Sequence, residues 1–147
     1  MHIIPESLNN FQTAIQPFKH FDIALYTGNG SSRTIQNSNF QPDFVWIKKR
    51  NGIDNHRLAN TVIGGNSHLK SDATDAEATG TTVIQSFGVG GNSFTVGSDN
   101  SVNASGGYYN AWQWKGGGTS SNIAVGSVSS GVPSIASTVS ANTNAGF

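Results

Sequence analysis

Residues 108–115 read Tyr-Tyr-Asn-Ala-Trp-Gln-Trp-Lys, and this stretch does most to decide the fold. Side chains alternate between the two faces of a β-strand, so every second residue shares a face. One face carries Tyr108, Asn110, Trp112 and Trp114, and the other carries Tyr109, Ala111, Gln113 and Lys115. The run therefore predicts a long strand with aromatic residues on both of its faces.

A second apolar run, Phe44-Val45-Trp46-Ile47, follows Pro42 and ends at Lys48-Lys49-Arg50. Apolar residues on both faces are typical of a central strand that is covered on both sides. Burying a tryptophan removes up to ~200 Å² from water, so we expect Trp46 and Trp112 in the core. Trp114 and Tyr109, near a strand end or on the opposite face, are the better candidates for contacts with a ligand or partner.

Outward from these two runs, the sequence predicts several shorter strands. Residues 21–26 alternate in polarity and are followed by Gly28-Asn29-Gly30, so residues 33–36 are expected to return as a hairpin partner. Further strands are expected at 57–63, 82–87 and 93–96, with a long surface loop at 67–81 and a turn at 88–91. This spacing predicts an all-β fold, an antiparallel β-sandwich of the jelly-roll or concanavalin-like kind.

The composition limits the functions that the chain can serve. With 147 residues there is room for one domain, and the eight basic and eight acidic residues leave no net charge. No basic surface is available to hold a phosphate backbone, so nucleic acid is not an expected partner. We expect self-association, because a neutral chain lacks the charge repulsion that keeps copies apart. The sequence contains no cysteine, no recognisable secretion signal and no run long enough to cross a membrane.

The two ends of the chain differ from the middle, which divides the sequence into residues 1–20, 21–115 and 116–147. Leu8, Phe11 and Ile15 recur at helical spacing between two prolines, so a short amphipathic helix is expected at about residues 6–16. A helix this short is not stable alone, so it either packs on its own domain or docks on a larger assembly.

The C-terminal stretch from Gly116 to Phe147 contains no charged side chain. Its composition suits either a flexible linker or extended strands that pair with another chain, and its β-branched residues favour the strands. The expected assembly contacts from the two ends are Leu8, Phe11, Ile15, Val125, Val128, Val132, Ile135 and Val139.

No residue pattern predicts a catalytic, metal or cofactor site. Asp54 and His56 are close in sequence but lack the third group that a nucleophilic or acid-base site needs. Asp72, Asp75 and Glu77 could offer oxygens to Ca²⁺, although they do not follow a calcium-loop spacing, and a solvated acidic loop is the preferred interpretation.

Four phrases occur together and in order: residues 26–30 (YTGNG), 40–50 (FQPDFVWIKKR), 94–99 (FTVGSD) and 109–115 (YNAWQWK). In this combination, residues 21–115 resemble a repeat domain of unassigned activity in tail-fibre-like and virion structural proteins of marine and cyanobacterial bacteriophages. The resemblance implies a β-sandwich used in a phage appendage, located in the virion and assembled in the host cytoplasm.

The resemblance leads to a main hypothesis and two alternatives. The main one is a non-enzymatic virion structural protein, part of a fibre or surface appendage, that binds itself and other virion proteins and attaches to the host. A trimer is expected by analogy with phage fibres. The first alternative is a lectin-like module that binds host surface glycans, with Tyr109 and Trp114 as the contacts. The second is a polysaccharide depolymerase, which would need two facing carboxylates that the sequence does not single out.

Overall fold

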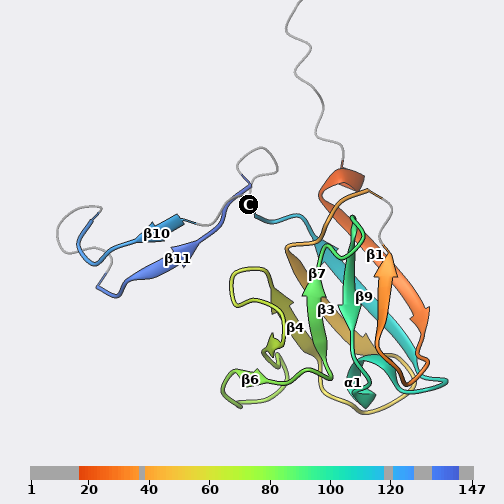
Figure 1. The fold of residues 1–147 in the computed structure, drawn as a ribbon. Coiled ribbons are helices and arrows are strands. Elements are labelled where there is room, and N and C mark those ends of the chain that lie inside the picture. Colours follow the sequence, from red (N-terminus) through yellow and green to blue (C-terminus); the bar gives the residue numbers. More distant parts are fainter. Residues whose placement is uncertain (1–16, 37–38, 118–120, 128–133, 143–147) are drawn as a thin grey trace, which may run out of the picture.

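The computed structural model describes residues 17–36, 39–117, 121–127 and 134–142. Within these ranges the fold is all-β, with two main antiparallel sheets packed face to face (Figure 1). The four-stranded sheet has the order β1 (Phe21–Thr27), β9 (Tyr108–Trp114), β3 (Phe44–Lys49) and β4 (Arg57–Asn60). The three-stranded sheet has the order β2 (Arg33–Gln36), β8 (Ser93–Val96) and β7 (Ile84–Phe87).

Two small hairpins and two short helical segments complete the described structure. The hairpins are β5 (Ser67–His68) with β6 (Ala78–Thr79), and β10 (Ser121–Ile123) with β11 (Ser137–Val139). A 3₁₀ turn, η1 (Pro17–Lys19), precedes β1, and the helix α1 (Asn100–Asn103) lies between β8 and β9. No helix in the described part of the chain is long and apolar enough to span a membrane.

The predicted all-β sandwich is confirmed, but one predicted pairing is wrong. β2 does not form a hairpin with β1; it pairs with β8 in the other sheet. The reason lies in the segment after β1, which does not turn back on itself. Gly28 N donates to Gly107 O and Gly30 N donates to Asn103 O, so the chain crosses from one sheet to the other. Gly28 is required there, because a β-carbon would lie 2.2 Å from the carbonyl oxygen of Ala104.

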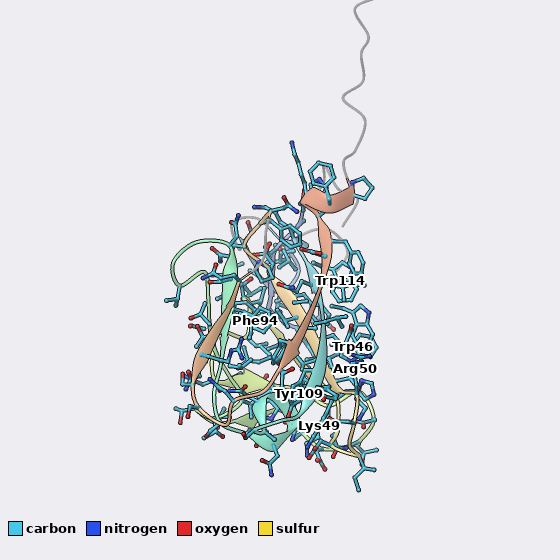
Figure 2. All side chains as sticks on the ribbon, turned by 90° about the vertical axis from the view of Figure 1, so that its right-hand side faces the viewer. Trp46, Lys49, Arg50, Phe94, Tyr109 and Trp114 are labelled. Atoms are coloured by element: carbon cyan, nitrogen blue, oxygen red, sulfur yellow. The ribbon has the colours of Figure 1, made fainter. Side chains whose placement is uncertain are left out.

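The hydrophobic core lies between the two main sheets. Its side chains come from the facing sides of both sheets and from α1, and they are Ile35, Val45, Ile47, Ala59, Val83, Ile84, Phe94, Val96, Val102, Tyr109 and Ala111. Figure 2 shows Phe94 between the sheets, whereas Trp46 and Trp114 lie on the opposite side of the four-stranded sheet. The core therefore uses the Tyr109 face of β9 rather than its tryptophan face.

Two tyrosine hydroxyls at the base of the core are hydrogen-bonded to backbone groups. The Tyr109 hydroxyl donates to Asn100 O and accepts from Ala104 N, each at 2.7 Å. Tyr26 stacks on the Tyr109 ring at 5.1 Å, and its hydroxyl donates to Val102 O at 2.7 Å. Burial raises the pKa of both tyrosines, so both hydroxyls remain donors. These bonds join α1 to the four-stranded sheet.

Some predicted features lie outside the described residues. They are the helix at residues 6–16 with Leu8, Phe11 and Ile15, and two of the C-terminal contact residues, Val128 and Val132.

Candidate functional site

The outward side of the four-stranded sheet is an apolar surface, which we call the outer face. The strand register places Phe21, Trp114 and Phe44 in one row and Ile23, Trp112, Trp46 and Leu58 in the next. We define the outer face as Phe21, Ile23, Leu25, Phe44, Trp46, Leu58, Tyr108, Trp112 and Trp114. Its β1 edge is open to solvent, with exposed fractions of 45% for Ile23, 63% for Leu25 and 52% for Tyr108.

The aromatic rings of the outer face pack against one another across the strands. Trp114 lies 5.2 Å from both Phe21 and Phe44, measured between ring centroids, and Trp46 lies 5.7 Å from Trp112. The ring planes in these pairs are inclined by 54–59°. Tilted packing of this kind fixes the rings as a continuous apolar layer.

Charge is nearly absent from this surface. Among the outward positions of the four described strands, Lys48 carries the one charged side chain. Its Nζ donates to Asp54 O at 2.8 Å and Gly52 O at 3.2 Å, which holds the charge at the loop edge. At the same edge, Trp46 Nε1 donates to His56 Nδ1 at 2.7 Å. The outer face therefore presents mostly apolar side chains, with its one charge held at the edge.

Three sequence predictions about aromatic residues need correction. Trp46 and Trp112 are not in the core; they are half-buried on the outer face. Tyr109 is wholly buried, so it cannot contact a glycan or a partner. The physical reason is that the inner positions of β9 face the second sheet, where Ala111 leaves room for Phe94 and the other core side chains. Trp114 is half-buried between Phe21 and Phe44.

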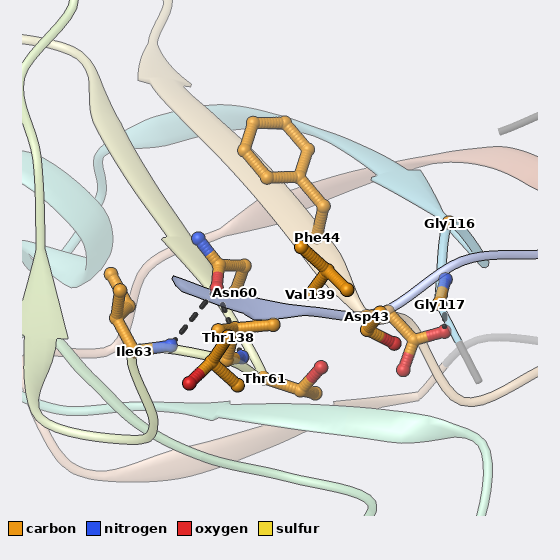
Figure 3. Close-up of a pocket in the computed structure, with 11 residues that line it drawn as sticks. Asp43, Phe44, Asn60, Thr61, Ile63, Gly116, Gly117, Thr138 and Val139 are labelled. Carbon is orange, nitrogen blue, oxygen red and sulfur yellow. Dashed lines mark hydrogen bonds between the residues drawn. The ribbon is translucent and has the colours of Figure 1, made fainter. Parts of the chain in front are cut away.

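A second feature is a hollow of about 440 Å³ between β11 and the adjoining ends of β3 and β4 (Figure 3). Its walls come from Asp43 and Phe44, residues 60–63, Gly116–Gly117 and residues 138–140. Asp43 Oδ2 accepts from Gly117 N at 3.1 Å, and Asn60 Oδ1 accepts from the backbone N of Val62 and Ile63. Sequence reasoning missed this site, because its walls are far apart in the chain and share no motif.

The β10–β11 hairpin projects from the sandwich (Figure 1). Its base is fastened where Asn142 Nδ2 donates to Lys115 O at 2.9 Å. The predicted contact residues Val125, Ile135 and Val139 are all exposed, and Ile135 is 74% exposed. A two-stranded hairpin with so little apolar burial is marginally stable by itself in water.

The residues considered for catalysis and for calcium are held by different partners. Asp54 pairs with Lys49 at 2.8 Å, whereas the His56 ring accepts from Trp46. In the acidic loop, Asp72 Oδ1 accepts from His56 N and Asp75 pairs with Lys70. The described ranges contain no group of three or more His, Asp or Glu side chains that could hold a metal ion.

One buried polar cluster is structural in character. Arg57 Nε donates to Ser101 Oγ at 2.9 Å, and Ser101 in turn donates to Asp99, the residue that caps α1. His68 is buried nearby. Its burial, and then the charge of Arg57, lower its pKa below the ordinary value of 6.5. The cluster ties β4 to α1 and favours a neutral imidazole.

Comparison with known proteins gives one match. Residues 16–147, nearly the whole chain, match the model of a family described as a domain of unknown function, DUF7483. No curated protein and no solved structure matches the chain.

Proposed function

The chain belongs to the DUF7483 family, and we propose that it is a structural protein of a bacteriophage particle that assembles with copies of itself through the outer face. It would form part of a fibre or surface appendage that contacts the host. The phage assignment is supported by the sequence phrases in residues 21–115, and the assembly by the surface that the fold leaves apolar.

The observation that carries the assembly proposal is the apolar outer face, which no other sheet of the described residues covers. Strands lie about 4.8 Å apart and same-face residues about 6.8 Å apart, so the face measures on the order of 400 Å² in flat area. An apolar patch of this size is comparable to the largest patch on a typical monomer, and such patches are often functional. A second copy fits it well, because two such faces bury each other and neither has to supply a complementary charge.

The size of the face also predicts the strength of the contact. A standard stable interface buries about 800 Å² on each partner, roughly twice the flat area of the outer face. Pairing through the outer face alone is therefore expected to be reversible and dependent on protein concentration. Pairing of the uncharged β10–β11 hairpins would add strand contacts and turn a weak pair into a durable oligomer.

Light scattering of two matched variants tests the assembly proposal. Leu25→Lys places a charge on the exposed β1 side of the proposed contact, and Val89→Lys places the same charge on an exposed apolar residue in the turn between β7 and β8. Since burying an unpaired charge is unfavourable, Leu25→Lys should lower the mean mass and Val89→Lys should leave it unchanged. Equal masses for both variants and the unaltered protein would overturn the proposal.

The phage assignment needs its own experiment. Purified particles of a phage that encodes this chain should contain it by mass spectrometry, and an antibody to it should label a fibre or surface projection by electron microscopy. Recovery of the protein only from the infected-cell lysate, with no label on the particles, would contradict a virion role.

A further inference from the structure

The hollow between β11 and the ends of β3 and β4 has the size of a small-molecule site. Its volume of about 440 Å³ lies within the range of ligand pockets, which run from about 300 to 1,000 Å³. Figure 3 shows Phe44 and Val139 on one part of its wall and Asp43, Asn60, Thr61 and Thr138 around it. Ligand sites typically combine an apolar wall with a few placed polar groups in this way.

The polar groups of the pocket present both donors and acceptors. Asn60 Oδ1 is committed to the backbone N of Val62 and Ile63, at 2.9 and 3.0 Å, so its amide nitrogen is the atom available to donate. In Figure 3 that nitrogen points away from those two bonds. The Asp43 carboxylate accepts one bond from Gly117 N and retains further lone pairs. Thr138 donates to Asn122 Oδ1 and can still accept.

The apolar wall is rigid, because it continues into the outer face. The Phe44 ring packs against Trp114 with a centroid distance of 5.2 Å, so its position does not depend on a ligand. A preformed aromatic wall beside hydrogen-bonding groups suits a molecule that has one apolar face and a rim of hydroxyls. A sugar ring has this character.

The charge of the pocket lining limits which ligands can bind. Among the residues that line the pocket there is no Lys, Arg or His, and Asp43 supplies its one charged side chain. An anionic group such as a phosphate, a sulfate or the carboxylate of an acidic sugar would meet no cation and would be repelled by Asp43. A neutral ligand is therefore favoured over an acidic one.

We propose that this pocket binds a neutral sugar unit of a glycan, with its hydroxyls on Asp43 and Asn60 and its C–H face against Phe44. This activity goes beyond self-assembly and uses residues that the outer-face contact does not need, apart from Phe44. Assembly would still affect it, since several weak sugar sites in one oligomer bind a glycan surface with higher avidity.

Saturation-transfer NMR tests the proposal with defined probes. The probes are the methyl glycosides of glucose, galactose, mannose and N-acetylglucosamine, with methyl glucuronide and inorganic phosphate as acidic comparisons. At least one neutral glycoside should bind with a millimolar or tighter dissociation constant, and the acidic probes should not. No signal from any neutral probe, or preference for the acidic ones, would overturn the proposal.

Near-isosteric variants then locate the binding site. Asp43→Asn removes the charge, and Asn60→Asp removes the amide donor but keeps the oxygen that Val62 and Ile63 need. Each should weaken glycoside binding at least tenfold with an unchanged urea midpoint, whereas Thr79→Val, exposed on β6 and outside the pocket, should bind normally. Normal binding by both pocket variants would place the sugar elsewhere and refute the assignment.

The assembly variant separates this proposal from the proposed function. Leu25→Lys should keep the single-site glycoside affinity while its mass falls. Loss of assembly with normal sugar binding supports both proposals. An unchanged mass with normal sugar binding contradicts only assembly through the outer face, and absence of sugar binding from an assembled protein contradicts only the pocket.

Discussion

The two faces of the four-stranded sheet differ in a way that hydrophobicity alone does not reveal. The inner face carries Tyr109 and Gln113, which are wholly buried because the three-stranded sheet and α1 pack across them. The outer face carries all three tryptophans, yet no other sheet of the described structure covers it. The core therefore forms on the face that has a partner within the fold. A face richer in aromatic residues that lacks one is a candidate for a partner from outside.

The largest expected effect is in the core between the inner face and the three-stranded sheet. Phe94→Ala should lower the free energy of unfolding by ~3–5 kcal/mol, because it removes a wholly buried ring and leaves a cavity. Ile23→Ala on the outer face should lower it by under ~1 kcal/mol in the dilute protein, since Ile23 remains largely exposed. Urea denaturation measures both. Similar losses would mean that the two faces do not differ in the isolated chain.

Two neighbouring tyrosines of β9 test the same difference between the faces, because each substitution below removes a single hydroxyl group. Tyr109→Phe removes a buried hydroxyl that bonds Asn100 O and Ala104 N, and it should destabilise by ~1–3 kcal/mol. Tyr108→Phe changes the exposed neighbour on the outer face and should be neutral within about 0.5 kcal/mol. If urea denaturation shows the same loss of unfolding free energy for both variants, the assignment of Tyr109 to the inner face and Tyr108 to the outer face is wrong.

Much of the fold follows from the sequence, because strand periodicity and turn chemistry are local. β8 was predicted at Ser93–Val96 and β9 at Tyr108–Lys115, and both are found within one residue of those bounds. Period two divides a strand into two faces but does not say which one is covered, so Trp46 and Trp112 were assigned to the wrong one. The core residues are those that face the second sheet, and tertiary packing decides which residues these are.

Contacts between residues far apart in the chain could not be predicted from the sequence either. The β2 strand follows the turn after β1 as a hairpin partner should, but backbone bonds to residues 103–107 carry the chain into the other sheet. The pocket is likewise assembled from Asp43, Asn60 and Thr138, which are brought together only by the folded sheet and the C-terminal hairpin.

Removing residues 116–147 distinguishes the contribution of the β10–β11 hairpin to assembly from that of the outer face. The sandwich should stay folded, with a melting temperature within a few degrees of the intact chain, because the hydrophobic core of the described residues extends no further than Ala111. The truncated protein should be a monomer at dilution, since the weak outer-face contact alone remains. If truncated and intact proteins give the same mass in light scattering, the hairpin has no role in assembly.

The smallest expected effect is the contribution of the buried His68 to the pH dependence of the free energy of unfolding. Burial and then Arg57 lower its pKa below 6.5, while Asp99 and Glu77 act in the opposite direction and Lys70 reinforces Arg57. As pH falls below 6.5, the unfolded chain therefore binds the proton before the folded one, and the free energy of unfolding declines. His68→Gln should show a weaker decline in urea titrations. An identical decline in the variant would remove His68 as the cause.

Hydroxyl-radical footprinting of the intact protein at low and high concentration tests the outer face most directly. If copies meet through this surface, oxidation of Ile23, Leu25 and Tyr108 should fall as concentration rises, while Val89, exposed in the turn between β7 and β8, stays equally reactive. Unchanged oxidation of the outer face in an assembled sample would contradict the account.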